Sequence, residues 1–361
     1  MAFASTALRN QSNPLRAQSV DGEAELQTGI ALTRQGQFTE AIPHFIAAQG
    51  RVRDEYAADF NLALCYVATG QPERAIGLLN SLKDRGKSAA EVNNLLAQAY
   101  IGTGKVKEAM AAFQLAVAQT PEDEKLYLFL ADACMDHRSY DLGLQILNTG
   151  LQHLPDSARL QYERGVFYSL EDLPDSALQD YRLAEKSAPN GDIFYMAAGQ
   201  AALLQGNISE AVRITGKGIR AGHRNFILLA LFGSAVADSG AEPDEPTFAE
   251  AETALEESIA ENPNYEGSRL ALAKLELLAN RLDDAITHLE RARQLAPADP
   301  AVYSHLAVAY RRKGELAKAR EALGTLAKLD ATQVAKYKTD SPNKAGYVAS
   351  GRSTRKPSQK Q

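Results

Sequence analysis

The sequence predicts an all-α protein made of about nine helical hairpins that follow one another along the chain. Three observations support this: small residues that recur every 34 residues, apolar residues at helical spacing around them, and glycine or proline where each helix should end. With 361 residues, 45% of them hydrophobic, the chain can bury a large core. In a repeat array that core lies between neighbouring repeats, so length alone does not give the number of domains.

Two series of small residues define the repeat. The first series stands at Gly29, Ala63, Ala97, Ala131, Gly165, Gly199 and Gly233, and resumes six residues out of phase at Ala273 and Ala307. The second series stands at Ala41, Ala75, Ala109, Gly143, Ala177 and Ala211, and resumes at Ala251, Ala285 and Ala319. Small residues at both places let two antiparallel helices approach closely, so each copy is predicted to be a hairpin.

The repeat divides the chain into three segments. We expect a flexible leader over residues 1–21, an array over residues 22–333 and a disordered basic tail over residues 334–361. Copies should begin near residues 22, 56, 90, 124, 158, 192, 226, 266 and 300. The phase slip corresponds to a six-residue insertion near residues 241–246, after which Thr247 and Glu250 predict a capping box that restarts the helix.

Helix-terminating residues stand at the turn and at the end of most hairpins. Glycines such as Gly36 and Gly104 suit a left-handed stop after the first helix. Prolines such as Pro121 end the second helix. The fourth and fifth copies depart from this pattern, because Arg138 and Asp172 stand where the turn glycine is expected.

The pattern resembles the tetratricopeptide repeat family. Small residues fall at the eighth and twentieth places, an aromatic such as Tyr66 or Tyr100 near the eleventh, and proline at the thirty-second. The resemblance covers residues 22–333 and implies a right-handed α-α superhelix whose first helices line a concave groove. It further implies a protein–protein interaction scaffold, without identifying the partner.

Charge and hydropathy narrow the partners and the compartment. The net charge is −6, but the residues after 330 contain seven basic side chains and one acid, so the array itself is strongly acidic. Such a surface repels a phosphate backbone, and we expect no nucleic-acid partner. No stretch is apolar enough for a transmembrane segment or a secretory signal. A cytoplasmic location is the default, with an exported or organellar one left open.

Signatures of catalysis are absent from the sequence. The stretch Gly102–Lys105 weakly resembles a phosphate-binding loop, but Ala99 stands where such a loop requires its first glycine. The six histidines lack zinc-site spacing, and Cys65 and Cys134 fall at packing places two repeats apart. We therefore expect no cofactor, no metal, and two free buried thiols.

The resemblance also indicates which residues should line the groove, namely places 2, 5, 6, 9, 12 and 13 of each first helix. The candidate partner-binding residues are Phe60, Asn61, Leu64, Asn94, Gln98, Lys125, Phe129, Asp132, Arg159, Tyr162, Glu163, Gln200, Lys274, His305 and Arg312. Starting from the first, second or third copy, the matching places do not form the Lys, Asn and Arg clamp by which chaperone-binding members of the family grip a C-terminal carboxylate.

Three functions remain open at this point. The favoured one is a non-catalytic adaptor that binds a protein or peptide in the groove. The alternative is a structural or self-associating component of a larger, even envelope, complex. A remote third is an enzyme with an acid–base pair among Asp132, Glu163 and Lys274.

Overall fold

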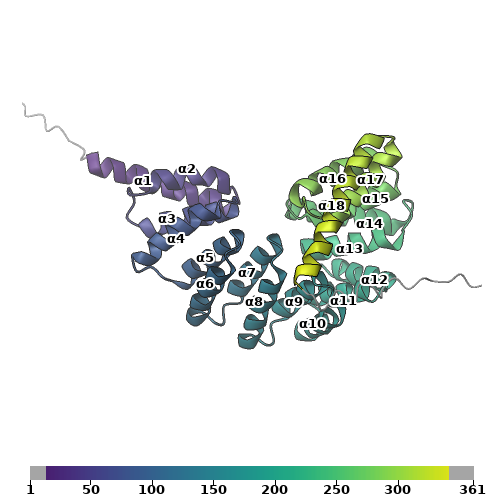
Figure 1. Cartoon of the computed structure of the whole chain (residues 1–361), viewed down its shortest axis with the longest axis horizontal. Helices are drawn as coiled ribbons and strands as arrows, with labels where there is room; N and C mark the ends of the chain where they lie inside the picture. Colours follow the sequence, from purple (N-terminus) through teal and green to yellow (C-terminus); the bar gives the residue numbers. More distant parts are fainter. Residues whose placement is uncertain (1–13, 341–361) are drawn as a thin grey trace, which may run out of the picture. The chain divides into compact units, whose positions relative to one another are not determined.

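The protein is all-α, as the sequence predicts (Figure 1). A computed structural model describes residues 14–340, and within that range it contains eighteen helices and no strand. The outer parts of the expected leader and tail, residues 1–13 and 341–361, lie outside the described residues.

The chain divides into two compact units, Met1–Ser187 and Ala188–Gln361. The helices of the first unit are α1 (Pro14–Arg34), α2 (Phe38–Ala48), α3 (Glu55–Ala68), α4 (Pro72–Asp84), α5 (Ala90–Gly102), α6 (Val106–Gln119), α7 (Glu124–Asp136), α8 (Tyr140–His153), α9 (Ala158–Leu170) and α10 (Pro174–Ser187). Those of the second unit are α11 (Asp192–Leu204), α12 (Ile208–Arg220), α13 (Phe226–Ser239), α14 (Pro246–Glu261), α15 (Glu266–Leu278), α16 (Leu282–Leu295), α17 (Pro300–Lys313) and α18 (Leu316–Asp340).

Within each unit, every odd-numbered helix packs along the even-numbered helix that follows it. The odd-numbered helices from α3 onward begin at residues 55, 90, 124, 158, 192, 226, 266 and 300, beside the expected copy starts. Helix α1 begins at Pro14 and so includes residues 14–21 of the expected leader, while α18 continues to Asp340, beyond the expected end of the array.

The small residues lie where helices of one hairpin or of adjacent hairpins touch. A Cβ atom on Gly143 would lie 2.0 Å from Cε1 of Phe167, a ring on the first helix of the next copy. A Cβ atom on Gly165 would lie 2.7 Å from Cε1 of Tyr181. Because heavy atoms cannot approach so closely, each glycine makes room for a particular ring.

The turns within hairpins use the left-handed conformation whether or not glycine is present. Gly36 and Gly104 have φ of 74° and 70°, and Arg138 and Asp172 have φ of 54° and 56°. A non-glycine residue held there carries steric strain of about 1 kcal/mol. The packing of the two helices therefore dictates the turn conformation. Where Arg138 and Asp172 replace glycine, the turn keeps that conformation in spite of the steric strain.

Hydroxyl groups join successive copies at their prolines. The Tyr127 hydroxyl donates to the Pro121 carbonyl at 2.7 Å, and the Tyr303 hydroxyl donates to the Pro297 carbonyl at the same distance. Each tyrosine holds the fourth place of its copy, so the same contact recurs where one second helix ends and the next first helix begins.

The capping box expected after the insertion is not formed. Helix α14 begins at Pro246 with Glu245 as its N-cap, which places Thr247 inside the helix. Glu250 instead forms an ion pair with Arg220 of the preceding hairpin. Proline at the first helical position needs no cap for its own missing N–H, which explains why the helix starts earlier than predicted.

Candidate functional site

Helices α7 and α9 pack together in the first unit and bring three predicted groove residues into one electrostatic cluster. Asp132 lies on α7, and Arg159 and Glu163 lie one turn apart on α9. Arg159 Nε is 4.0 Å from Glu163 Oε1, the outer limit of an ion pair. Both carboxylates respond to the charge of Arg159.

The carboxyl groups of this cluster hold their protons unusually well. Burial and the neighbouring charge of Asp132 raise the pKa of Glu163 to about 7, against the lowering effect of Arg159. The surrounding protein and Asp136 raise the pKa of Asp132, again offset by Arg159. Burial likewise raises the pKa of Asp136. Desolvation and the mutual repulsion of the acids therefore outweigh the attraction of Arg159 for Asp132 and Glu163.

An exposed aromatic ring lies beside these charges. Phe129 is 54% exposed, and it precedes Asp132 and Asp136 by three and seven residues on α7, so the three share one stripe of the helix. Lys125, also exposed, lies one turn before Phe129. We call Lys125, Phe129, Asp132, Asp136, Arg159 and Glu163 the α7–α9 face.

Asp136 was absent from the predicted set although it belongs to this surface. It holds the thirteenth place of its copy, one of the groove-facing places, and a seven-residue spacing from Phe129 was the available signal. Its side chain is exposed, yet desolvation by the protein around it raises its pKa, an effect that sequence alone does not show.

Two predicted groove residues prove to be packing residues, which corrects the prediction for them. Tyr162 is 2% exposed and its ring lies 5.9 Å from that of Tyr181. Asn94 is 7% exposed and donates to the Leu126 carbonyl at 3.1 Å, which ties α5 to α7. Both hold the fifth place of a copy, and in these two copies the side chain there packs against neighbouring helices, whereas Phe60, at the same place of its own copy, is half-buried.

The remaining predicted residues of the first unit are partly buried. Phe60 stacks on Tyr56 with ring centroids 5.7 Å apart, and Leu64 packs against the core of the unit. The Asn61 side chain donates to the Ala57 carbonyl of its own helix at 2.8 Å. Gln98 donates to the Asn94 side chain at 2.6 Å and so extends the link between α5 and α7.

The predicted residues of the second unit include three that are held by contacts within that unit. Lys274 forms an ion pair with Asp238 at 2.5 Å. His305 Nδ1 lies 2.7 Å from the carbonyl of Ala301, and Arg312 donates to the Leu277 carbonyl at 2.7 Å. Gln200, on α11, is half-buried.

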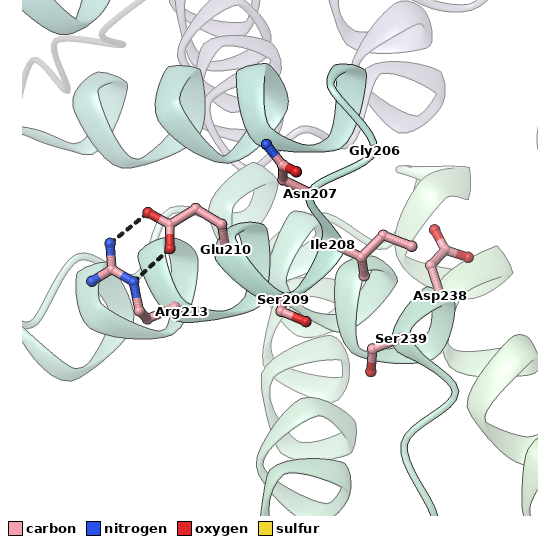
Figure 2. Close-up of a pocket in the computed structure, with 8 residues that line it drawn as sticks. All are labelled: Gly206, Asn207, Ile208, Ser209, Glu210, Arg213, Asp238 and Ser239. Atoms are coloured by element: carbon pink, nitrogen blue, oxygen red, sulfur yellow. Dashed lines mark hydrogen bonds and ion pairs between the residues drawn. The ribbon is translucent and has the colours of Figure 1, made fainter.

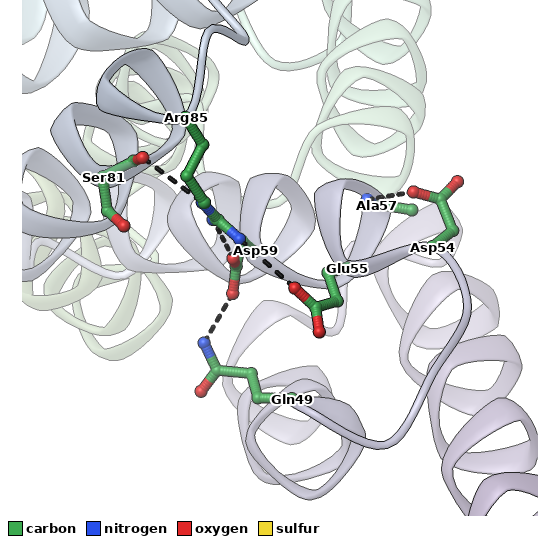
Figure 3. Close-up of polar contacts among 7 residues, drawn as sticks. All are labelled: Gln49, Asp54, Glu55, Ala57, Asp59, Ser81 and Arg85. Atoms are coloured by element: carbon green, nitrogen blue, oxygen red, sulfur yellow. Dashed lines mark hydrogen bonds and ion pairs between the residues drawn. The ribbon is translucent and has the colours of Figure 1, made fainter.

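A polar cluster around the buried carboxylate of Asp59 joins three helices at the start of the array (Figure 3). Asp59, 9% exposed on α3, accepts from the Gln49 side chain at 2.7 Å and pairs with the Arg85 guanidinium. Arg85 also reaches Glu55 at 3.5 Å. The cluster satisfies a buried carboxylate and ties the ends of α2 and α4 to α3, which is a structural role.

The second unit contains an open hollow between the α11–α12 turn and the C-terminal end of α13 (Figure 2). Asn207, Ser209 and Asp238 line it. Arg213, also at its wall, turns toward Glu210 and makes two hydrogen bonds to that carboxylate, at 2.6 and 2.5 Å. The hollow is shallow and its charged groups are already paired, so it lacks the enclosure that catalysis normally requires.

Other chemistries find little support in the described residues. Among the side chains that the structure describes, no three of His, Cys, Asp or Glu are grouped to hold a metal ion. None of the helices described is long and apolar enough to span a bilayer. Cys65 and Cys134 are free and buried, as expected, and burial raises the pKa of the Cys134 thiol to about 12, which makes it a poor nucleophile.

Comparison with known proteins agrees with the repeat pattern. One tetratricopeptide repeat model matches residues 32–99, 100–162 and 277–339, and a second matches residues 247–300. DnaJ homolog subfamily C member 3 of Gallus gallus is 27% identical over 192 residues, or 48% of this chain. The chain spans only 37% of that relative's length.

Solved structures similar to this chain include two bacterial proteins. A tetratricopeptide repeat protein from Parabacteroides merdae is 14% identical, with a TM-score of 0.48, and the match covers 71% of this chain and 99% of that protein. MamA from Desulfovibrio magneticus RS-1 is 19% identical, with a TM-score of 0.37, over 49% of this chain and 96% of that protein. Because the first repeat model alone matches more than half of the residues, the chain belongs to the tetratricopeptide repeat family.

Proposed function

We propose that this protein is a non-catalytic adaptor that binds a protein or peptide on the first helices of its repeats, and that the α7–α9 face is the binding surface of the first unit. The general part of this proposal follows from family membership, because tetratricopeptide repeats are protein-interaction modules. The specific part rests on the residues of the face.

The exposure of Phe129 is the observation that carries the proposal. A phenylalanine that is 54% exposed leaves roughly 100 Å² of ring surface in water, and burying it would stabilise a complex by about 2.5 kcal/mol. Polar and charged side chains surround the ring, an arrangement typical of an anchor site with a polar rim. The acidic groups there also disfavour a nucleic-acid partner.

Affinity capture with the full-length chain tests this function. Phe129→Ala should lose captured partners or weaken them about 30-fold or more, the loss expected for a hot-spot residue. Leu115→Ala is the matched control, because Leu115 is 46% exposed in the same unit but lies on the second helix α6. Circular dichroism should show equal folding of both variants. Recovery of the same partners, equally tightly, by Phe129→Ala would remove the assignment of the face.

Self-association is a second candidate function, favoured by the apolar surface of α18. Leu316 and Leu323 are 56% and 52% exposed and lie seven residues apart, on one stripe of the helix. Tyr140 holds the same place in the fourth copy as Leu316 does in the ninth. There it packs edge-on against Phe167 of the next copy. A second copy of the chain could cover the leucines of α18 in the same way.

A further inference from the structure

We propose that the partner of the α7–α9 face presents a lysine or arginine side chain next to an apolar side chain, an inference that rests on the proposed function. The apolar group would cover Phe129, and the cation would lie between Asp132 and Glu163. The arrangement of charge on the face and an internal comparison of two buried carboxylates carry this inference.

The α7–α9 face separates its apolar and acidic parts along α7. Phe129 is followed by Asp132 one turn later and by Asp136 one further turn on, and Glu163 approaches from α9. Lys125 lies on the opposite side of Phe129 from the carboxylates. A ligand whose cation follows its apolar side chain therefore meets attraction at one end of the ring and repulsion at the other, which favours one orientation.

The Glu163 side chain is largely enclosed, but the protein gives its carboxylate only a weak ion pair. Its side chain is 15% exposed, and Arg159 is 4.0 Å away. Among the described residues, that long contact is the ion pair recorded for its carboxylate. Because the Glu163 side chain is not fully enclosed, its oxygens stay open to a ligand, and a ligand's N–H groups could add charge-assisted hydrogen bonds there.

Asp180, in the same unit, shows how the fold treats a carboxylate that serves structure alone. It is 2% exposed, and Arg164 donates to both of its oxygens at 2.7 Å. The two carboxylates lie on adjacent helices of one hairpin, yet only Asp180 is fully paired. The contrast indicates that the carboxylate of Glu163 can still accept hydrogen bonds from a bound partner.

The groups that face Glu163 would reinforce a cationic ligand. The groups that interact with Glu163 are Asp132 on α7, Arg159 on α9 and Tyr181 on α10. Arg164 is paired with Asp180, and Arg159 is the cation that acts on both Asp132 and Glu163. A guanidinium could make paired hydrogen bonds to a carboxylate and stack on the Phe129 ring at once, so arginine should bind better than lysine.

Selection of random 12-residue peptides on the full-length chain tests the inference. Peptides that depend on Phe129 should carry Lys or Arg within a few residues of an apolar side chain. Their affinity, measured by fluorescence anisotropy of synthetic peptides, should fall at least tenfold in the Asp132→Asn, Asp136→Asn, Glu163→Gln variant. Replacing the peptide's Arg by Gln should lower its affinity for the natural chain at least tenfold as well. The same replacement should hardly change its affinity for the triple variant.

A charge-matched control makes the result specific to the face. The control variant is Asp84→Asn, Glu122→Gln, Asp156→Asn, which removes the same charge from exposed positions of the first unit and should change affinity less than twofold. If Phe129-dependent peptides are neutral or acidic, or bind both variants alike, the inference is wrong and the proposed function stands. If no selected peptide depends on Phe129, the proposed function fails and the inference with it.

Discussion

A buried carboxylate on α15 makes the stability of the second unit depend on pH in a direction opposite to that of most proteins. Glu276 is 5% exposed, and its Oε2 atom is buried without a hydrogen-bond partner. Burial, Asp284 and Glu256 raise its pKa from 4.5 to about 7. His288 Nε2 lies 3.6 Å from Glu276 Oε1, and burial lowers the pKa of that imidazole.

The size of the effect follows from the shift. A difference of about 2.5 pH units between folded and unfolded chains corresponds to about 3 kcal/mol, at 1.36 kcal/mol per unit. The folded chain holds the proton of Glu276 more tightly, so this stabilisation is complete below pH 4.5 and is lost as pH rises to 7. His288 contributes the opposite slope, because its neutral form is favoured in the folded chain and stability is lost as pH falls below 6.5.

Glu276→Gln removes the first effect and leaves the second. At pH 8 the variant should be more stable than the natural chain by up to about 3 kcal/mol, and near pH 4.5 the two should be about equal. Urea unfolding followed by circular dichroism measures both values, and a carbon-13 titration of the Glu276 carboxyl gives its pKa directly.

The control for this prediction is Glu261→Gln, which changes an exposed carboxylate at the end of α14 in the same unit. Its effect on the free energy of unfolding should be small and equal at both pH values. If Glu276 titrates near 4.5, or if Glu276→Gln brings no gain at pH 8, then the carboxylate is solvated in the folded chain and the reasoning is refuted.

Two further predictions concern packing and assembly. Gly143→Ala should lower the free energy of unfolding by about 1–3 kcal/mol or more, because the new methyl would overlap Phe167, whereas Gly77→Ala, inside α4 with open space around it, should raise it by about 0.5–1 kcal/mol. Equal losses in urea unfolding would contradict the close approach. If α18 mediates self-association, Leu316→Glu with Leu323→Glu should abolish any rise of light-scattering mass with concentration, and an unchanged rise would exclude that surface.

The sequence by itself determined the repeat and the class of fold. Period, turn and helix end depend on local chemistry, so a glycine at place 20 or a proline at place 32 has the same meaning in every copy. The periodicity places Gly143 at a helix contact, but its partner, the ring of Phe167 in the next copy, is seen only in the structure. Family membership could be inferred from the same letters.

Only the tertiary structure decided which first-helix side chains remain free to bind a partner. Tyr162 and Phe129 hold neighbouring places in their copies, yet one is buried and the other is largely exposed. The spacing of residues fixes the direction of a side chain about its helix, but its exposure depends on what the next hairpin places opposite it. The pairing of Glu276 with His288 and the raised pKa of Glu163 beside Asp132 arise for the same reason: their environments are assembled from helices that only folding brings together.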